Sequence, residues 1–288
     1  MLARHGIWLT RAMGQHLLVD RSVLERIVAA ADLGPEDEVL EVGPGAGVLT
    51  EALSRQAGRV VAVELDPRLI RVLRETVRAP NVDVIQADAL EINPALLFHG
   101  QPFKLVSNLP YNVATPLIRK LLYAPPRSRP EEMVVMVQKE VAQRLVARPG
   151  EMSRLSVEAQ LVADVELLFE VKPESFFPPP EVESAVVRLR PLPEYRVPVL
   201  PNERRFFQTV EAAFRQRRKQ LHNALGELGV GKERIQSALG AAGIDPMRRA
   251  ETLSLEEWSR LSAALWPEKA GQTRSAAGSG HVRAEPAL

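Results

Sequence analysis

The stretch Asp37-Glu38-Val39-Leu40-Glu41-Val42-Gly43-Pro44-Gly45-Ala46-Gly47-Val48 decides the fold. A short apolar strand, 38–42, runs directly into glycines at alternate positions, and a helix is expected to follow from Val48 to Arg55. Glycine adopts positive φ and lets a ligand approach the backbone, so such a loop predicts a site for a nucleotide-type cofactor. A turn needed only for packing would use the same glycines, so the loop alone is not specific.

Strands and helices alternate on the C-terminal side of this stretch. Polar residues stand at the strand ends, with Glu64 closing the second strand, Asp88 just beyond the third and Asn108 after the fourth. This alternation predicts an α/β fold with a parallel, doubly wound, Rossmann-like sheet whose site lies at the carboxyl ends of the strands. The expected strands are 38–42, 59–63, 82–85, 103–106, 132–137 and 184–189.

The domain organisation follows from a change in composition. Four prolines fall within residues 191–201 and mark a linker. We therefore expect a catalytic, cofactor-binding domain over 1–195 and a small all-α C-terminal domain over 196–267. Residues 268–288 are rich in Gly, Ser, Ala and Arg without periodicity, and we expect a disordered tail there.

The overall composition narrows the function classes. The 288 residues are 45% hydrophobic and 25% charged, and they include no cysteine, which excludes disulfides, thiolate metal sites and a cysteine nucleophile. No metal site is predicted. No signal peptide or membrane span is apparent, so we expect a cytoplasmic protein with no membrane partner.

The acidic residues that follow the glycine loop indicate which kind of cofactor it binds. A dinucleotide pattern needs a glycine where this chain has Val48, and no phosphate-binding lysine follows the loop. Glu64 lies at the spacing from Gly43 that suits the two ribose hydroxyls of a cofactor, and Asp88 is placed to meet an adenine amino group. Together these residues predict an adenosine-containing cofactor along the edge of the sheet.

The segment Asn108-Leu109-Pro110-Tyr111 indicates the chemistry. An adenine N6 amine is a poor nucleophile because its lone pair is delocalised into the ring. The Asn108 carboxamide oxygen and the Leu109 carbonyl, held by Pro110, can accept hydrogen bonds from the two N–H groups of this amine. Tyr111 offers a face on which the extruded base can stack. In-line displacement from a sulfonium needs positioning more than acid–base catalysis, so S-adenosylmethionine is the predicted methyl donor. A simple strand-ending turn is the alternative.

Two other regions carry candidate sites. In Phe176-Phe177-Pro178-Pro179-Pro180, one phenylalanine is expected to form the opposite wall of the base sandwich and one to enter the core, and we favour Phe177 for the wall. Between Asn202 and Arg249, ten basic and five acidic side chains leave five excess positive charges. This suits phosphate binding, and a solvated helical surface explains it equally well. The candidate RNA-binding residues are Arg215, Arg217, Arg218 and Lys219.

Taken in order, these motifs resemble those of the KsgA-type (RsmA) ribosomal RNA adenine dimethyltransferases, from about residue 10 to 265. The matching stretches are Gly14-Gln15-His16-Leu17-Leu18, 41–50, 63–66, 87–90, 107–112, 136–142 and 177–184.

The resemblance implies dimethylation of two adjacent adenosines in a hairpin near the 3′ end of 16S rRNA, on an immature 30S subunit. We expect a monomer. One departure concerns His16-Leu17, where the family usually has Asn-Phe. The residues expected to bind the cofactor are His16, Leu18, Gly43, Gly45, Glu64, Asp88, Ala89 and Asn108.

Three alternatives stay open at this point. An enzyme that methylates an adenine of 23S rRNA and confers macrolide resistance more typically has Asn-Ile-Pro-Tyr. A DNA adenine methyltransferase would carry a second proline in place of Leu109 and a separate domain that reads sequence. Finally, the protein could act mainly by binding, as a ribosome-assembly factor.

Overall fold

A computed structural model describes residues 16–199, 202–216 and 218–267. The chain forms two compact units. The first contains the described residues up to Gln143 together with Asp164–Pro191, and the second contains Arg144–Ala163 and the described residues from Leu192 onward. Residues 144–163, which the sequence analysis placed with the first domain, thus group with the C-terminal helices. The expected tail over 268–288 lies outside the described residues.

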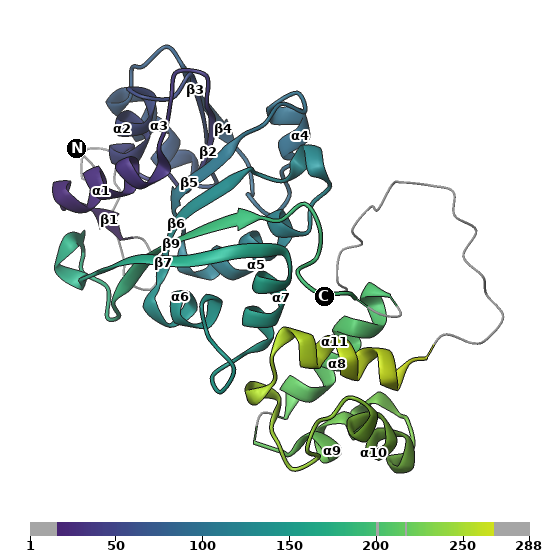
Figure 1. Ribbon diagram of the computed structural model, residues 1–288. Helices are drawn as coiled ribbons and strands as arrows, with labels where there is room; N and C mark the ends of the chain where they lie inside the picture. Colours follow the sequence, from purple (N-terminus) through teal and green to yellow (C-terminus); the bar gives the residue numbers. More distant parts are fainter. Residues whose placement is uncertain (1–15, 200–201, 217, 268–288) are drawn as a thin grey trace. The chain divides into compact units, whose positions relative to one another are not determined.

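The first unit is built on a seven-stranded sheet with the order β4-β3-β2-β5-β6-β9-β7 (Figure 1). The pairs β2–β3, β3–β4, β2–β5 and β5–β6 are parallel, whereas β9 runs antiparallel to β6. The doubly wound α/β sheet expected from the sequence is confirmed, and it is parallel from β4 to β6, whereas the expected strand 184–189 returns antiparallel. Its strands are β2 (Glu38–Val42), β3 (Arg59–Glu64), β4 (Val82–Gln86), β5 (Lys104–Asn108), β6 (Glu132–Gln138), β7 (Ala163–Val171) and β9 (Ser184–Pro191).

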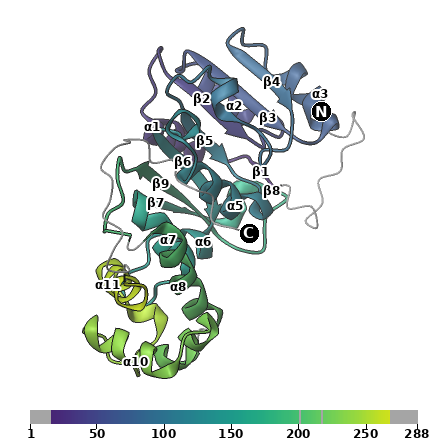
Figure 2. The ribbon, with the colours of Figure 1, turned by 90° about the vertical axis from the view of Figure 1, so that its right-hand side faces the viewer.

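Helices cover both faces of this sheet (Figures 1 and 2). Helices α1 and α2 share one buried cluster with alternate residues of the central strands, and α3 packs on β3 and β4. Helix α5 packs against β6. Local sequence starts these helices, since Asp20 caps α1 and Asp66 caps α3, whose first residue is proline. The helices are α1 (Arg21–Ala31), α2 (Val48–Ser54), α3 (Pro67–Thr76), α4 (Pro94–Leu97), α5 (Tyr111–Leu122) and α6 (Lys139–Leu145).

The strand order reverses between β2 and β5, which is where a doubly wound sheet opens a crevice for a ligand. Backbone pairing between these strands covers only Val39 with Lys104 and Leu40 with Leu105. Beyond it, the buried Ser107 hydroxyl donates to the Val42 carbonyl at 2.6 Å and accepts from the Val42 N–H at 3.3 Å. The strands are therefore held together by a side chain at the point where they diverge.

A second, two-stranded sheet pairs β1 (Leu17–Leu18) with β8 (Phe176–Phe177) in antiparallel orientation. Leu17 lies opposite Phe177, and Leu18 opposite Phe176. The N–H groups of Val19 and Asp20 both donate to the Ser175 carbonyl, which extends the contact. This ribbon brings the N-terminal part of the described chain against the proline-rich segment.

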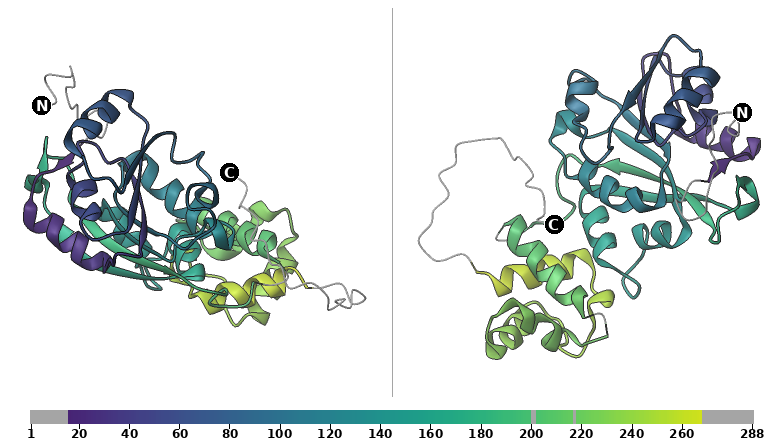
Figure 3. Two further views of the ribbon diagram at one scale, coloured as in Figure 1. Left: turned by 90° about the horizontal axis from the view of Figure 1, so that it is seen from above. Right: turned by 180° about the vertical axis from the view of Figure 1, so that it is seen from behind.

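The described residues of the second unit form helices (Figure 3). Phe214 of α8 and Trp258 of α11 have ring centroids 5.6 Å apart in its core. Among the described residues of both units, no helix combines the length and apolarity that crossing a membrane requires. The helices are α7 (Arg154–Val162), α8 (Glu203–Arg215), α9 (Leu221–Ala224), α10 (Lys232–Ala241) and α11 (Leu255–Leu265), with short 3-10 turns at Leu225–Leu228 and Ala250–Thr252.

Candidate active site

The glycine loop follows β2 at the switch point. Gly43, Gly45 and Gly47 have φ values of 69°, 59° and 86°, which L-residues with a side chain rarely adopt. A Cβ on Gly43 would lie 2.8 Å from Pro110 Cγ, and one on Gly45 would lie 2.8 Å from Leu17 Cδ2. The loop therefore lies directly against both the Asn108–Tyr111 segment and β1, and only glycine allows this approach.

Glu64, at the end of β3, faces the same loop. Its carboxylate accepts from the N–H groups of Leu65 at 2.8 Å and Asp66 at 2.9 Å, and from that of Gly45 at 3.4 Å. The side chain is buried, and burial raises its pKa. Glu64 thus places hydrogen-bond acceptors beside the loop, as the sequence spacing predicted.

Asp88 lies just beyond β4 and shapes a turn. Its Oδ1 accepts from the Leu90 N–H at 2.8 Å, and Oδ2 makes no hydrogen bond with the described residues. The adjacent Ala89 is buried. The turn is held by Lys120 of α5, whose Nζ donates to the carbonyls of Leu90 at 2.6 Å and Ile92 at 2.7 Å. Sequence reasoning missed Lys120, because nothing in the sequence relates α5 to this turn.

Glu41 is a second buried carboxyl near the loop, two residues before Gly43. It is 2% exposed, and its Oε2 has no hydrogen-bond partner among the described residues. Burial, with a smaller contribution from the charge of Glu64, raises the pKa of Glu41 from 4.5 to about 8. The sequence analysis treated Glu41 only as a strand residue.

The Asn108–Tyr111 segment joins β5 to α5. The Leu109 side chain is buried, and its N–H donates to the Met136 carbonyl at 3.1 Å. Pro110 is the N-cap of α5, and Tyr111 is the first residue of that helix. The segment is therefore anchored on both sides and leaves the Asn108 side chain at the edge of the sheet.

Tyr111 is held by a residue that the sequence analysis did not single out as functional. Its hydroxyl lies 3.0 Å from the Oγ of Ser184, which is fully buried at the start of β9. Burial raises the pKa of Tyr111, so the phenol is neutral at physiological pH. Ser184 lies 73 positions away in sequence, and only the pairing of β9 with β6 brings it to this site.

His16 connects three parts of the site. Its Nδ1 donates to the Pro178 carbonyl at 2.7 Å, and its own carbonyl accepts from Asn108 Nδ2 at 3.4 Å. Its ring centroid lies 5.8 Å from that of Tyr111. Leu18, expected to contact the cofactor, lies in the buried cluster beneath α1 and α2.

The two phenylalanines of β8 have different environments. Phe176 is 3% exposed and belongs to the core, whereas Phe177 is 63% exposed. The structure therefore places Phe176 in the core, and the Phe177 side chain is accessible to a ligand.

The candidate residues follow the order of the strands. Along the carboxyl edge, Asp88 follows β4, Glu64 ends β3, the glycine loop follows β2 and Asn108 ends β5. Three strand spacings of about 4.8 Å make this edge roughly 15 Å long. A molecule that lies along it meets these groups in turn.

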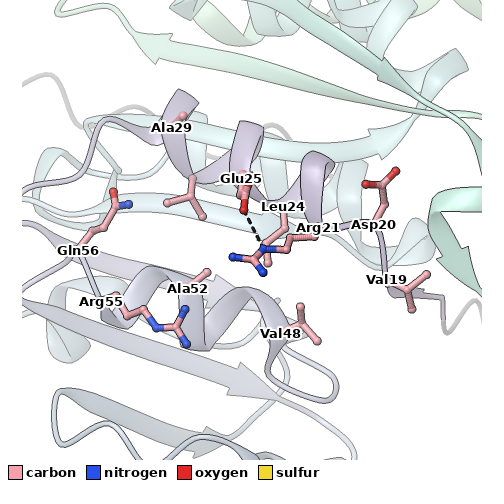
Figure 4. Close-up of a pocket in the computed structure, with 11 residues that line it drawn as sticks. Val19, Asp20, Arg21, Leu24, Glu25, Ala29, Val48, Ala52, Arg55 and Gln56 are labelled. Atoms are coloured by element: carbon pink, nitrogen blue, oxygen red, sulfur yellow. Dashed lines mark hydrogen bonds and ion pairs between the residues drawn. The ribbon is translucent and has the colours of Figure 1, made fainter.

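A groove of 690 Å³ lies elsewhere in the first unit, between α1 and α2 (Figure 4). Val19 and Val48 line it, and the Arg21–Glu25 ion pair lies along its α1 side. None of Glu64, Asp88 and Asn108 contributes to its lining. The chemistry of the edge, rather than the volume of this groove, identifies the candidate site.

The candidate RNA-binding residues of the second unit differ in how they are paired. Arg215 is exposed and forms ion pairs with Glu211 at 3.2 Å and Glu227 at 3.6 Å. Arg218 and Lys219 are exposed and form no ion pair with the described residues. The predicted contact at Arg217 lies outside the described residues. The described residues also contain no group of three or more His, Cys, Asp or Glu side chains that could hold a metal ion.

Known proteins are similar to this chain in sequence and in fold. The ribosomal RNA small subunit methyltransferase A of Dehalococcoides mccartyi is 45% identical over 264 residues, which cover 91% of this chain and 90% of that protein. That of Geobacter metallireducens is 45% identical over 268 residues, covering 90% and 96%.

Two solved structures resemble the whole fold. The 23S rRNA methyltransferase ErmE is 32% identical with a TM-score of 0.67 and covers 86% of this chain and 99% of its own. A dimethyladenosine transferase from Plasmodium falciparum is 27% identical with a TM-score of 0.68, covering 85% and 96%. The higher identity to the small-subunit enzymes favours that group over the ErmE type.

The family model described as ribosomal RNA adenine dimethylase matches residues 9–265. The resemblance inferred from the motifs is confirmed: the chain belongs to the ribosomal RNA adenine dimethylase family, whose members are methyltransferases.

Proposed function

We propose that the protein transfers methyl groups from S-adenosylmethionine to the N6 atoms of two adjacent adenosines in the hairpin near the 3′ end of 16S rRNA. The observation that carries this proposal is the Asn108 carboxamide. Its Nδ2 donates to the His16 carbonyl, which leaves Oδ1 as the acceptor presented at the edge of the sheet. The glycine loop lies directly beside it, across the contact of Gly43 with Pro110.

The residues along the edge fit an adenosine-based cofactor. The loop at Gly43 and Gly45 turns sharply at the end of β2 with positive φ values and packs closely against Pro110 and Leu17, and these two glycines place no side chain at this part of the edge. The Glu64 carboxylate suits the ribose hydroxyls, and Asp88 Oδ2 suits the adenine amino group. When bound, the cofactor would supply an electrophilic sulfonium methyl. Leu18 and Ala89 would complete the pocket from below.

The acceptor side needs two hydrogen-bond acceptors and a stacking surface. Asn108 Oδ1 and the Leu109 carbonyl are the acceptors for the adenine N6 hydrogens. The Leu109 N–H donates to Met136, and the Leu109 carbonyl lies in the peptide bond to Pro110, whose ring restricts the backbone at the start of α5. The Tyr111 ring, fixed by Ser184, and the exposed Phe177 are proposed to hold the extruded base between them.

The proposed substrate is 16S rRNA in an immature 30S subunit, met by a monomer in the cytoplasm. Relatives named for the small subunit support this choice. The first unit would perform the chemistry, and the helical second unit would contact RNA through its exposed basic residues, with Arg218 and Lys219 as the best placed.

The test is incubation of unmethylated small subunits with labelled S-adenosylmethionine and the enzyme, followed by mapping of the modified nucleotides. We expect two adjacent dimethylated adenosines in the 3′ hairpin. In parallel, Asn108→Ala should lose at least about 100-fold in methyl transfer, as when a transition-state hydrogen bond is removed, while it still binds the subunit. Small subunits that take up no label in the 3′ hairpin, while large subunits incubated in a parallel reaction become labelled, would overturn the proposed substrate. Normal subunit maturation by Asn108→Ala in cells would instead show that binding is the main role.

A further inference from the structure

His16 lies at the junction of the two walls of the site. Its carbonyl contacts Asn108, its imidazole contacts Pro178, and its ring lies beside Tyr111. We propose that His16 is a positioning residue for the acceptor adenine, which orients the Asn108 carboxamide and ties the Phe177–Pro178 segment to it. This inference rests on the proposed function and differs from the cofactor contact that the family pattern implies.

The carbonyl of His16 decides which way the Asn108 amide points. Because a carbonyl only accepts, the 3.4 Å contact selects the orientation with Nδ2 toward His16 and Oδ1 away from it. The opposite orientation would present an NH₂ donor to an adenine amine, which is also a donor. The placement of the His16 backbone therefore determines whether Asn108 can accept from the substrate.

The imidazole in turn fixes that backbone. The Pro178 carbonyl only accepts, so the 2.7 Å contact requires a proton on His16 Nδ1. The neutral Nδ1–H tautomer and the imidazolium both supply it, so the link does not depend on the charge of the ring. The same contact holds Pro178 next to Phe177, the residue proposed to cover the base.

The strand pairing makes this link local. Leu17 pairs with Phe177 in the β1–β8 ribbon and reaches the Gly45 side of the loop. His16 stands just before the ribbon, where no backbone pairing continues among the described residues. Its side chain thus adds a contact between the start of the described chain and the segment after Phe177.

This chemistry predicts which substitutions preserve the role. The amide nitrogen of asparagine occupies the position of histidine Nδ1, whereas that of glutamine corresponds more closely to Nε2. His16→Asn should keep the bond to Pro178, and His16→Gln and His16→Ala should lose it. The usual asparagine of the family at this position is consistent with a donor at that point.

The experiment compares these three variants of the full chain. For His16→Gln and His16→Ala we expect kcat on unmethylated small subunits, measured at saturating S-adenosylmethionine, to fall at least about 10-fold. His16→Asn should recover kcat to within about 3-fold of the parent. If asparagine behaves like glutamine, or if saturating S-adenosylmethionine restores kcat in His16→Gln and His16→Ala, the positioning role is wrong.

A second measurement does not depend on methyl transfer. The side-chain amide resonances of Asn108, assigned by their disappearance in Asn108→Ala, should shift in His16→Gln and keep their positions in His16→Asn. Unmoved resonances in His16→Gln would overturn the inference. The amide resonances could shift in His16→Gln although the unsubstituted protein fails to methylate small subunits. That result would support the positioning of Asn108 by His16 and overturn the proposed function.

Discussion

Glu41 places a carboxyl in the interior at the end of β2, where one of its oxygens has no partner among the described residues. Burial disfavours the charged form, and the pKa rises from 4.5 to about 8. Glu41 is therefore mainly protonated at neutral pH. A neutral acid two residues before Gly43 keeps a second negative charge away from Glu64, so Glu64 is the charged one of these two buried acids beside the glycine loop.

This titration predicts how stability depends on pH. Between pH 4.5 and 8 the folded protein binds a proton that the unfolded chain has released, so the free energy of unfolding falls as pH rises through that window. At about 1.36 kcal/mol per pKa unit, the full loss is of order 5 kcal/mol. The neutral variant Glu41→Gln should lack this slope. Urea titrations of both proteins from pH 5 to 8.5 would check it, and a constant difference between them would show that Glu41 titrates normally.

Sequence reasoning located the residues whose place follows from strand ends. Glu64, Asp88 and Asn108 each end or follow a parallel strand, and parallel strands bring their carboxyl ends to one edge. Ser184 and the Pro178 contact of His16 were not foreseen, because they depend on the antiparallel return of β9 and on the β1–β8 ribbon. Local pattern carries no signal for such long-range pairs.

At the scale of elements, the turn between β2 and α2 has to fit against α5. Gly43→Ala introduces a Cβ 2.8 Å from Pro110 at a φ of 69°. Gly229→Ala is a matched control, because its φ is also 69° and a Cβ there meets nothing within 4 Å. In both variants the free energy of unfolding should fall by about 1–2 kcal/mol, because alanine disfavours the left-handed backbone.

Only Gly43→Ala should also weaken S-adenosylmethionine binding, by at least about 10-fold, in calorimetry. Equal cofactor affinity in the two variants would contradict the close approach of the loop to Pro110.

The elements that were missed share a physical cause. Helix α7 is followed directly by β7, and there is no glycine or proline between Arg154 and Val171. No turn residue therefore marks where the helical spacing of apolar residues ends and the strand begins. Strands β1 and β8 have two residues each, too short for any periodicity. The strands that were predicted, such as β2 and β6, are longer apolar runs next to clear turns.

At the scale of the whole molecule, the formal net charge is only +1, so attraction to RNA must come from local charge. The second unit carries exposed cations of two kinds. Arg215 is shared between two carboxylates, whereas Arg218 and Lys219 have no ion-pair partner among the described residues. A cation already paired within the protein has less to gain from a phosphate, so the unpaired residues should dominate binding.

Charge removal at these positions separates RNA binding from ordinary solvated surface. The double variant Arg218→Gln, Lys219→Gln should weaken binding to small subunits and flatten the plot of log affinity against log salt by roughly 0.7–0.9 for each phosphate that is no longer neutralised. Arg215→Gln, which removes one cation from the neighbouring ion pairs, should change the slope less. Cofactor affinity should stay unchanged in both, since the residues proposed to bind the cofactor lie in the first unit. Filter binding at about 50 to 300 mM salt would measure this slope for the parent and for both variants. Identical slopes for parent and double variant would mean that these charges are solvated surface, and that another part of the protein binds the subunit.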